Sequence, residues 1–168
     1  NELYASVFSK TYGFKTIGLR YFNIFGKRQN PNGVYAAVIP KWISAIINME
    51  DVFIYGDGET SRDFCFIDNA VQMNLLAATN EDDNATNQVY NVALNDRTSL
   101  NKLYQMLEER IPKRIKGIEI QDPIYRDFRA GDVMHSQANN RSLLEIGWKP
   151  QYSMEQGIQK TLAISQSI

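Results

Sequence analysis

The sequence has few of the residues that hold disulfide-rich and zinc-binding proteins together. It contains one cysteine, Cys65, and one histidine, His135. A single cysteine forms no intramolecular disulfide framework, and one cysteine with one histidine falls short of the Cys/His ligand set of a structural zinc site. We therefore expect no bound metal, a core of ordinary apolar packing, and a reducing compartment, the cytoplasm.

Long apolar runs and an excess of one charge are also missing. No stretch approaches the roughly 18 to 20 apolar residues that cross a bilayer. The 18 Lys and Arg residues against 19 Asp and Glu residues give a formal net charge of −1. A chain without a basic field, and without a basic stripe interleaved with aromatic residues, is not typical of nucleic-acid binding proteins. We predict no nucleic-acid and no membrane partner, so any phosphate binding must be local.

What the sequence does contain is a globular composition with alternating strands and helices. Of its 168 residues, 43% are hydrophobic and 22% are charged, which is enough for a sizeable core. Helical spacing ends at Gly13, an apolar run of strand length covers residues 16–22, and a polar loop covers residues 23–35. A helix is expected over residues 38–49 and a strand over residues 53–55. This alternation predicts an α/β fold with a parallel sheet.

The second part of the chain repeats the alternation. A strand is expected over residues 62–67, followed by a helix that Asp68 caps. The helix that begins at Thr98 and Ser99 should stop at Pro112, because proline disrupts a helix interior. Further expected elements are strands over residues 89–92 and 118–120, an irregular stretch over residues 122–138, and helices over residues 140–146 and 153–165.

The first helix starts abruptly. Leu3, Val7 and Phe8 already follow helical spacing directly after Asn1, which is not an initiator methionine. A helix this short is marginal in water by itself. We therefore expect it to be the end of a longer helix, and the chain to be a piece of a longer protein.

Two arginine-containing segments are candidates for anion binding. Arg62 lies beside Asp63, and Arg129 lies in a segment with Asp127 and Asp132. Arginines from separate segments can hold a diphosphate with paired hydrogen bonds. The alternative is that each arginine pairs with a neighbouring carboxylate on a solvated face, and composition by itself favours this alternative.

Three other features have plain structural interpretations. Gly56-Asp57-Gly58 lacks the third glycine of a dinucleotide-binding fingerprint and is followed by a strand, so we expect an ordinary turn. No serine or cysteine nucleophile is marked out beside His135, which argues against a catalytic base there. Cys65 lies within an expected strand and should be a buried core residue.

The sequence also resembles a known family over essentially its whole length. The similar strings are RYFNIFG at residues 20–26, PNGVYAAVIPKWI at 31–43, YGDGETSRDFCFIDN at 55–69, YNVA at 90–93 and RAGDVMHSQAN at 129–139. They resemble the C-terminal half of the extended short-chain dehydrogenase/reductases. Within that group they are most similar to UDP-hexose 4-epimerases that act on the N-acetylated sugars UDP-GlcNAc and UDP-GalNAc.

The resemblance implies a domain division. The chain would hold the C-terminal part of a Rossmann-type NAD(P)-binding fold and a small α/β substrate-binding lobe, with the N-terminal Rossmann strands missing. Residues 1–35 and 66–95 would belong to the Rossmann domain, and residues 36–65 and 96–168 to the nucleotide-sugar-binding lobe. The family usually forms homodimers through a helix bundle that includes the first helix.

The resemblance also implies roles for individual residues. Tyr21 and Phe22 would lie at a tightly held NAD, with Phe22 contacting the nicotinamide through its backbone. The uracil ring would pack on Tyr55, and Arg62 and Arg129 would neutralise the two phosphates. The other implied substrate-binding residues are Asn23 at the sugar-diphosphate, Ala37 and Val38 with backbone N–H groups toward the nucleotide, and Asp132 at the ribose hydroxyls.

Two further positions bear on the choice of sugar. Ser136 stands where epimerases restricted to UDP-glucose and UDP-galactose have a bulky tyrosine, and a small residue leaves space for an acetamido group. Gln29, with Asn23, could then contact the sugar. Because a steric gate rejects oversized substrates more strongly than small ones, we expect acetylated sugars to be accepted without strict exclusion of the others.

The family's catalytic pair and its glycine-rich phosphate loop are absent from this sequence. In the first helix Tyr4 is followed four positions later by Phe8, not by the lysine of a Tyr-x-x-x-Lys pair. We expect that pair upstream of Asn1, and we expect the chain alone to be inactive. Two alternatives stay open: a related nucleotide-sugar dehydratase or uronate epimerase, and a non-catalytic UDP-sugar-binding module.

Overall fold

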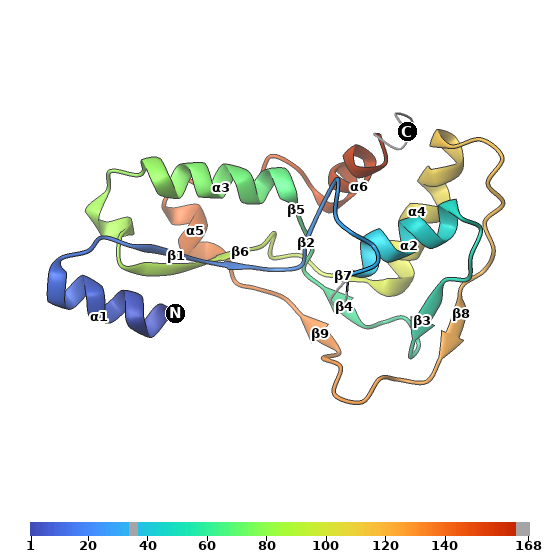
Figure 1. The fold of residues 1–168 in the computed structure, drawn as a ribbon, viewed down its shortest axis with the longest axis horizontal. Helices are drawn as coiled ribbons and strands as arrows, with labels where there is room; N and C mark the ends of the chain where they lie inside the picture. The colour runs from blue at the N-terminus through green and yellow to red at the C-terminus, as the bar shows by residue number, and fades with distance from the viewer. Residues whose placement is uncertain (34–36, 164–168) are drawn as a thin grey trace.

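The computed structural model describes residues 1–33 and 37–163. Figure 1 shows an elongated molecule in which two regions lie side by side. The first region contains α1 (Glu2–Tyr12), and the second contains α2 (Val38–Ile47) and α4 (Leu100–Arg114). Helices and parallel strand pairs are combined in one chain, so the predicted α/β class is confirmed.

The first region is built on two parallel strands. β1 (Ile17–Tyr21) pairs with β6 (Gln88–Val92) in parallel along its whole length. Figure 1 shows α3 (Ile67–Thr79) and α1 on opposite sides of this pair, with α5 (Arg141–Glu145) beside it. A short 3-10 turn, η1 (Asp83–Ala85), precedes β6. The buried core of this region consists of Cys65, Ala70, Met73, Tyr90, Val92, Leu143 and Trp148.

The second region has the larger core, enclosed by three helices. α2, α4 and α6 (Met154–Leu162) pack around it, and β2 (Ile24–Phe25) pairs in parallel with β5 (Cys65–Phe66) at its edge. α6 begins with a capping box in which Ser153 and Gln156 exchange hydrogen bonds with each other's backbone. The buried residues of this core are Phe25, Ile39, Trp42, Ile46, Val52, Ile54, Phe64, Phe66, Leu103, Tyr104, Met106, Leu107, Ile111, Met154, Ile158 and Leu162.

One glycine allows the close approach of α6 to the strand pair. A Cβ atom on Gly157 would lie 2.7 Å from Cζ of Phe25 and 2.8 Å from Cβ of Phe66. No real side chain tolerates such distances, so only glycine lets the helix pack here. This contact closes the second core against β2 and β5.

Two further small sheets are formed by short strands. β3 (Phe53–Tyr55) pairs in parallel with β8 (Ile124–Arg126). β4 (Ser61–Arg62) lies between β7 (Thr98–Ser99), to which it is antiparallel, and β9 (His135–Ser136), to which it is parallel. These pairings join segments that lie about 40 to 75 residues apart in the sequence.

The strand predicted over residues 62–67 is two strands. Ser61 and Arg62 pair with β7 and β9, whereas Cys65 and Phe66 pair with β2. Asp63 and Phe64 carry the chain from one sheet to the other, and both are buried. The apolar alternation runs through both strands, but the neighbouring strand changes between Arg62 and Cys65. Periodicity does not reveal such a change of pairing partner.

Four other expectations about the elements are wrong. α4 runs past Pro112 to Arg114, because the proline lies in the last turn, where the N–H of Ile115 still reaches the carbonyl of Ile111 at 2.9 Å. α3 starts at Ile67, so Asp68 lies inside the first turn and does not cap the helix.

Ile118 and Ile120 pack against the second core without strand pairing. The stretch over residues 122–138 contains β8 and β9, whose exposed side chains give no apolar alternation.

Within the described ranges, no helix combines the length and the apolar character that a bilayer crossing requires.

Candidate functional site

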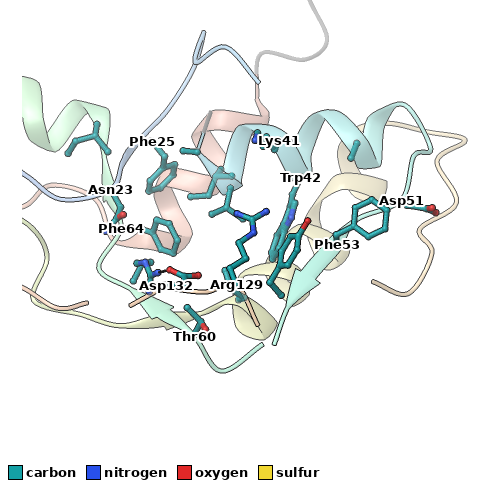
Figure 2. Close-up of a pocket in the computed structure, with 18 residues that line it drawn as sticks. Asn23, Phe25, Lys41, Trp42, Asp51, Phe53, Thr60, Phe64, Arg129 and Asp132 are labelled. Atoms are coloured by element: carbon teal, nitrogen blue, oxygen red, sulfur yellow. Dashed lines mark hydrogen bonds and ion pairs between the residues drawn. The ribbon is translucent and has the colours of Figure 1, made fainter. Parts of the chain in front are cut away.

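A cavity of about 490 Å³ opens where α2, β3, β4 and the segment after β8 meet. Figure 2 shows side chains from these elements arranged around it. Its lining combines apolar and aromatic side chains with a few charged ones, as is usual for small-ligand sites. The lining residues are Asn23, Ile24, Phe25, Ala37, Val38, Ile39, Lys41, Trp42, Ala45, Asp51, Phe53, Tyr55, Thr60, Arg62, Phe64, Leu100, Arg129 and Asp132.

The beginning of α2 faces this cavity. Ala37 is extended and immediately precedes the helix, and both Ala37 and Val38 line the cavity. The first N–H groups of a helix have no partner within the helix, and together with the helix dipole they favour an anion. Ala37 and Val38, for which the resemblance implied contact with a nucleotide, therefore both lie at the helix start on the cavity wall.

Arg62 reaches across the cavity floor to a segment far away in the sequence. Its Nη2 donates to Oδ1 of Asp132 at 2.5 Å, and its Nη1 donates to the carbonyl oxygens of Ser61 and Val133. The Arg62 side chain is 19% exposed. Arg62 thus holds the segment around Asp132 against β4, with a charge that is only partly covered.

Arg129 and Arg126 each stack on an aromatic ring of β3. The Cζ atom of Arg129 lies 3.7 Å from the ring centre of Tyr55, and that of Arg126 lies 3.5 Å from the ring centre of Phe53. Such stacking is favourable because the ring face is electron-rich. The nearby guanidinium of Arg129 first, and that of Arg126 second, lower the pKa of the Tyr55 phenol because they favour its charged form.

Asn23 enters the cavity from the end of β1. Its backbone has φ of 36°, a left-handed conformation that asparagine tolerates better than most residues. Its Nδ2 donates to the backbone carbonyl of Asp63 at 2.9 Å, and its own carbonyl accepts from the N–H of Cys65 at 3.3 Å. These bonds fix the side chain at the cavity mouth, with its Oδ1 not engaged in them.

The cavity brings together most of the residues that the sequence resemblance indicated. Figure 2 shows Asn23, Arg129 and Asp132 together at the cavity. The residues indicated from sequence that line it are Asn23, Ala37, Val38, Tyr55, Arg62, Arg129 and Asp132. They come from five separate parts of the chain, which only the fold joins.

Four indicated residues do not line the cavity. The Tyr21 hydroxyl donates to Oδ1 of Asn74 at 2.9 Å, and the backbone N–H of Phe22 donates to the carbonyl of Val92 at 3.2 Å. Gln29 donates from Nε2 to the carbonyl of Ile24 at 3.3 Å, and its buried Oε1 has no hydrogen-bond partner among the residues that the structure describes. The fourth, Ser136, pairs with Arg62 through the β4–β9 ladder.

The idea that each arginine pairs with its sequence neighbour is wrong for Arg62. Its carboxylate partner is Asp132, which lies 70 residues away, and not Asp63. Asp63 is fully buried and accepts backbone N–H groups instead. Arg129 likewise stacks on Tyr55. The two arginines therefore converge on one cavity from separate segments, as a diphosphate clamp requires.

Sequence reasoning did not indicate eleven of the 18 residues that line the cavity. Among these, Trp42 and Phe64 form part of its wall, and Lys41 adds a positive charge. Lys41 lies one helical turn after Val38, so the spacing itself could have indicated it. Figure 2 shows Lys41 and Trp42 on α2 above the cavity.

The other residues considered from sequence have structural roles. The Nδ1 atom of His135 lies 2.9 Å from Oγ of Ser61, across the β4–β9 pair. Cys65 is fully buried, which raises the pKa of its thiol to about 12. No cluster of three or more metal-binding side chains occurs in the ranges 1–33 and 37–163.

The chain offers only part of a dinucleotide site. The end of β1 supplies the Phe22 backbone and the exposed ring of Tyr21, which are a suitable surface for one end of a flat ring system. The sequence has no G-x-G-x-x-G phosphate loop. The roles of Tyr21 and Phe22 at the nicotinamide of NAD, which the resemblance implied, stay a prediction.

Comparison with known proteins identifies the family of the chain. Residues 1–93 match the family described as NAD dependent epimerase/dehydratase. A UDP-N-acetylglucosamine 4-epimerase from Methanobrevibacter ruminantium M1, solved with UDP-N-acetylmuramic acid, has a similar structure with a TM-score of 0.84 and 41% identity. That similarity covers 96% of this chain and 49% of the solved chain.

Curated relatives share sequence at a lower level. A putative UDP-glucose 4-epimerase from Methanocaldococcus jannaschii is 29% identical over 161 residues, which are 96% of this chain and 49% of the relative. A dTDP-glucose 4,6-dehydratase from Haemophilus influenzae is 29% identical over 160 residues, which are 91% of this chain and 45% of the relative. The chain thus spans about half the length of the curated relatives it matches, and it belongs to the NAD dependent epimerase/dehydratase family.

Proposed function

We propose that this chain is the substrate-binding half of an NAD-dependent UDP-N-acetylhexosamine 4-epimerase, which interconverts UDP-GlcNAc and UDP-GalNAc in nucleotide-sugar or polysaccharide biosynthesis. The observation that carries the proposal is the convergence of Arg62 and Arg129 on one cavity that also contains Tyr55 and the beginning of α2. Two cations, an aromatic ring and free helix N–H groups are what a nucleoside diphosphate needs.

Each part of a UDP-sugar has a complementary group in this proposal. The phosphates bind between Arg62 and Arg129, the uracil packs on Tyr55, and Asp132 accepts the ribose hydroxyls. Since Arg129 now covers the Tyr55 ring at 3.7 Å, the guanidinium moves from the ring to the phosphates when the nucleotide enters. The negative charge of the diphosphate favours this exchange over a neutral ring.

The sugar would lie toward the end of β1. Asn23 contacts the sugar-diphosphate, and Gln29 and Ser136 contact or border the sugar in this proposal. The Oε1 of Gln29 has no hydrogen-bond partner within residues 1–33 and 37–163, but Gln29 does not line the cavity, so its contact with the sugar rests on the resemblance alone. Ser136, as a small residue, leaves room for an acetamido group and supports the preference for N-acetylated sugars.

When bound, NAD would supply a reversible hydride acceptor for C4 of the sugar. Tyr21 and Phe22 would contact the nicotinamide. The proton at the C4 hydroxyl would be removed by a tyrosine that this chain does not supply. This chain matches only about half of its relatives, so we propose the activity for a protein that also contains the other half. We further propose a cytoplasmic homodimer.

A second candidate function is a dehydratase of the same family. The similarity to the dTDP-glucose 4,6-dehydratase of Haemophilus influenzae favours it, since that match covers 91% of this chain. A uronate epimerase or a non-catalytic UDP-sugar-binding module would use the same cavity. What separates these is the product formed from each nucleotide-sugar.

The test is turnover and binding with the natural full-length protein. We expect the full-length protein to convert UDP-GlcNAc to UDP-GalNAc, and chromatography that separates the two nucleotide-sugars measures this conversion. The 168-residue chain alone should show no turnover. A 4-keto-6-deoxy product from dTDP-glucose would establish the dehydratase instead. Binding of UDP without any turnover of the full-length protein would leave the non-catalytic module.

Arg62→Ala tests the site itself, with Arg20→Ala as the matched control. Removal of a charge-assisted hydrogen bond costs about 1.5 to 3 kcal/mol, so UDP should bind roughly 10 to 150 times more weakly. Arg20 pairs with Glu2 at 2.5 Å on the exposed surface of the first region, and its loss should leave UDP affinity within about twofold. Equal effects of the two variants in calorimetric titration would contradict the proposed site.

A further inference from the structure

Asp63 is a fully buried carboxylate that does not line the cavity. Its Oδ1 accepts the backbone N–H of Leu94 at 3.0 Å, and its Oδ2 accepts the backbone N–H of Ala138 at 3.2 Å. Burial raises the pKa of the Asp63 carboxyl, and the backbone N–H groups oppose that rise. A carboxylate placed at such a cost in desolvation needs a reason beyond filling space.

The partners of Asp63 come from segments that carry the cavity. Its own backbone carbonyl accepts Nδ2 of Asn23, from the end of β1. Leu94 follows β6, and Ala138 follows β9, which holds Ser136 beside Arg62. One residue therefore ties the ends of β1, β6 and β9 to the link between β4 and β5.

We propose that Asp63 is a positioning residue of the nucleotide-sugar site, which fixes Asn23, Arg62 and Ser136 relative to one another through backbone hydrogen bonds. This inference rests on the proposed function. Asp63 touches no part of the ligand. Because small displacements of binding groups weaken binding and reaction strongly, its loss misplaces the groups that do touch the ligand.

The chain offers a matched control in Asn69. Asn69 is also fully buried, and its Oδ1 also accepts two backbone N–H groups, those of Gln151 at 2.9 Å and Tyr152 at 3.1 Å. Its Nδ2 donates to the carbonyl of Tyr152 at 2.7 Å. None of these three residues lines the cavity. Asn69 therefore fastens backbone segments as Asp63 does, but away from the site.

The experiment compares Asp63→Asn with Asn69→Asp in the natural full-length protein. Both changes keep the size of the side chain, and each replaces one buried hydrogen bond with two donors or two acceptors that face each other, so both should lower the melting temperature. Only Asp63→Asn should weaken UDP binding, by about tenfold to a hundredfold, at a temperature where both variants are folded. It should also raise KM for the nucleotide-sugar while kcat stays within about twofold, because the reacting atoms are not contacted. Equal UDP affinity in the two variants would overturn the inference.

A second measurement uses the unaltered protein and decides the matter even if Asp63→Asn does not fold. Addition of UDP should slow hydrogen exchange at the amides of Leu94 and Ala138, and leave Gln151 and Tyr152 unchanged. Coupling between a ligand and these bonds is reciprocal, so the absence of added protection at Leu94 and Ala138 would overturn the inference. An unaltered protein that binds no UDP would instead overturn the proposed function, and with it any need for positioning.

Discussion

The two regions of the molecule use their apolar residues in opposite ways. α4 in the second region buries five residues, whereas α1 in the first region buries none. Leu107 on α4 is fully buried, and Leu3 on α1 is 84% exposed. Both helices are amphipathic in sequence, so the pattern identifies a helix but does not say whether its apolar face has found a partner.

The exposed apolar residues of the first region are not confined to α1. Phe14 continues the apolar surface beyond the helix, which ends at the exposed Tyr12, and Val71 and Leu75 are exposed on α3. Surfaces of this kind mark interaction sites more often than free surface. A homodimer, or the part of the relatives that this chain does not match, would cover them in the enzyme that we propose. The two regions therefore differ in how far their helices are covered: α4 buries its apolar face and α1 does not.

The largest expected effect tests this contrast directly. Leu107→Ala should destabilise the chain by about 2 to 5 kcal/mol, because it removes a buried side chain and leaves a cavity. Leu3→Ala should change the free energy of unfolding by less than about 0.5 kcal/mol. Urea denaturation of both variants of the 168-residue chain measures the difference. A large effect of Leu3→Ala would show that α1 is covered in solution, for example by a second copy.

Cys65 sharpens the comparison between the two cores. It belongs to the core of the first region, and burial raises the pKa of its thiol to about 12. Since the thiolate is the nucleophile, alkylation at pH 8 should be very slow in the folded chain and fast in urea. If the two regions open independently, Leu107→Ala should leave the alkylation rate in water nearly unchanged. If Leu107→Ala instead speeds the alkylation of Cys65 in proportion to its loss of stability, both regions unfold as one unit.

The smallest effect concerns the cavity side of the second region. Arg129→Gln should raise the pKa of Tyr55, because the Arg129 guanidinium is the main cause of its lowering. The chain has 9 tyrosines, so the measurement is the ultraviolet titration of each protein minus that of the same protein with Tyr55→Phe. The tyrosinate of Tyr55 should then appear at higher pH in the Arg129→Gln background. An unchanged titration would mean that Arg129 does not rest on the ring in solution.

Much of the fold could be predicted from local patterns. The apolar run that became β1 and the glycine that ends α1 were both visible, because an apolar run of strand length and the left-handed cap at Gly13 are local features of the sequence. β8 and β9 were missed, since their side chains are exposed and their strand character comes from pairing with β3 and β4. The predicted division after residue 35 stays a prediction.

The candidate site was predictable only through resemblance to a family. Composition favoured a pairing of Arg62 with the adjacent carboxylate, and nothing local pointed to Asp132, which lies 70 residues away. The placement of Arg129 on Tyr55 likewise depends on the pairing of β3 with β8. Contacts between residues this far apart in the sequence depend on which strands pair with each other. No short segment of the sequence shows that order.

By itself the sequence determined the class of the fold, the lack of a disulfide framework, and the residue types available for binding a phosphate. Those properties follow from composition and from periodicity over a few turns or strands. Only the tertiary structure decided that Asp63 is buried among backbone N–H groups and that Arg62 and Arg129 face one cavity. The reason is physical: burial and charge pairing depend on which distant segments come together, and that choice is made by the packing of the whole chain.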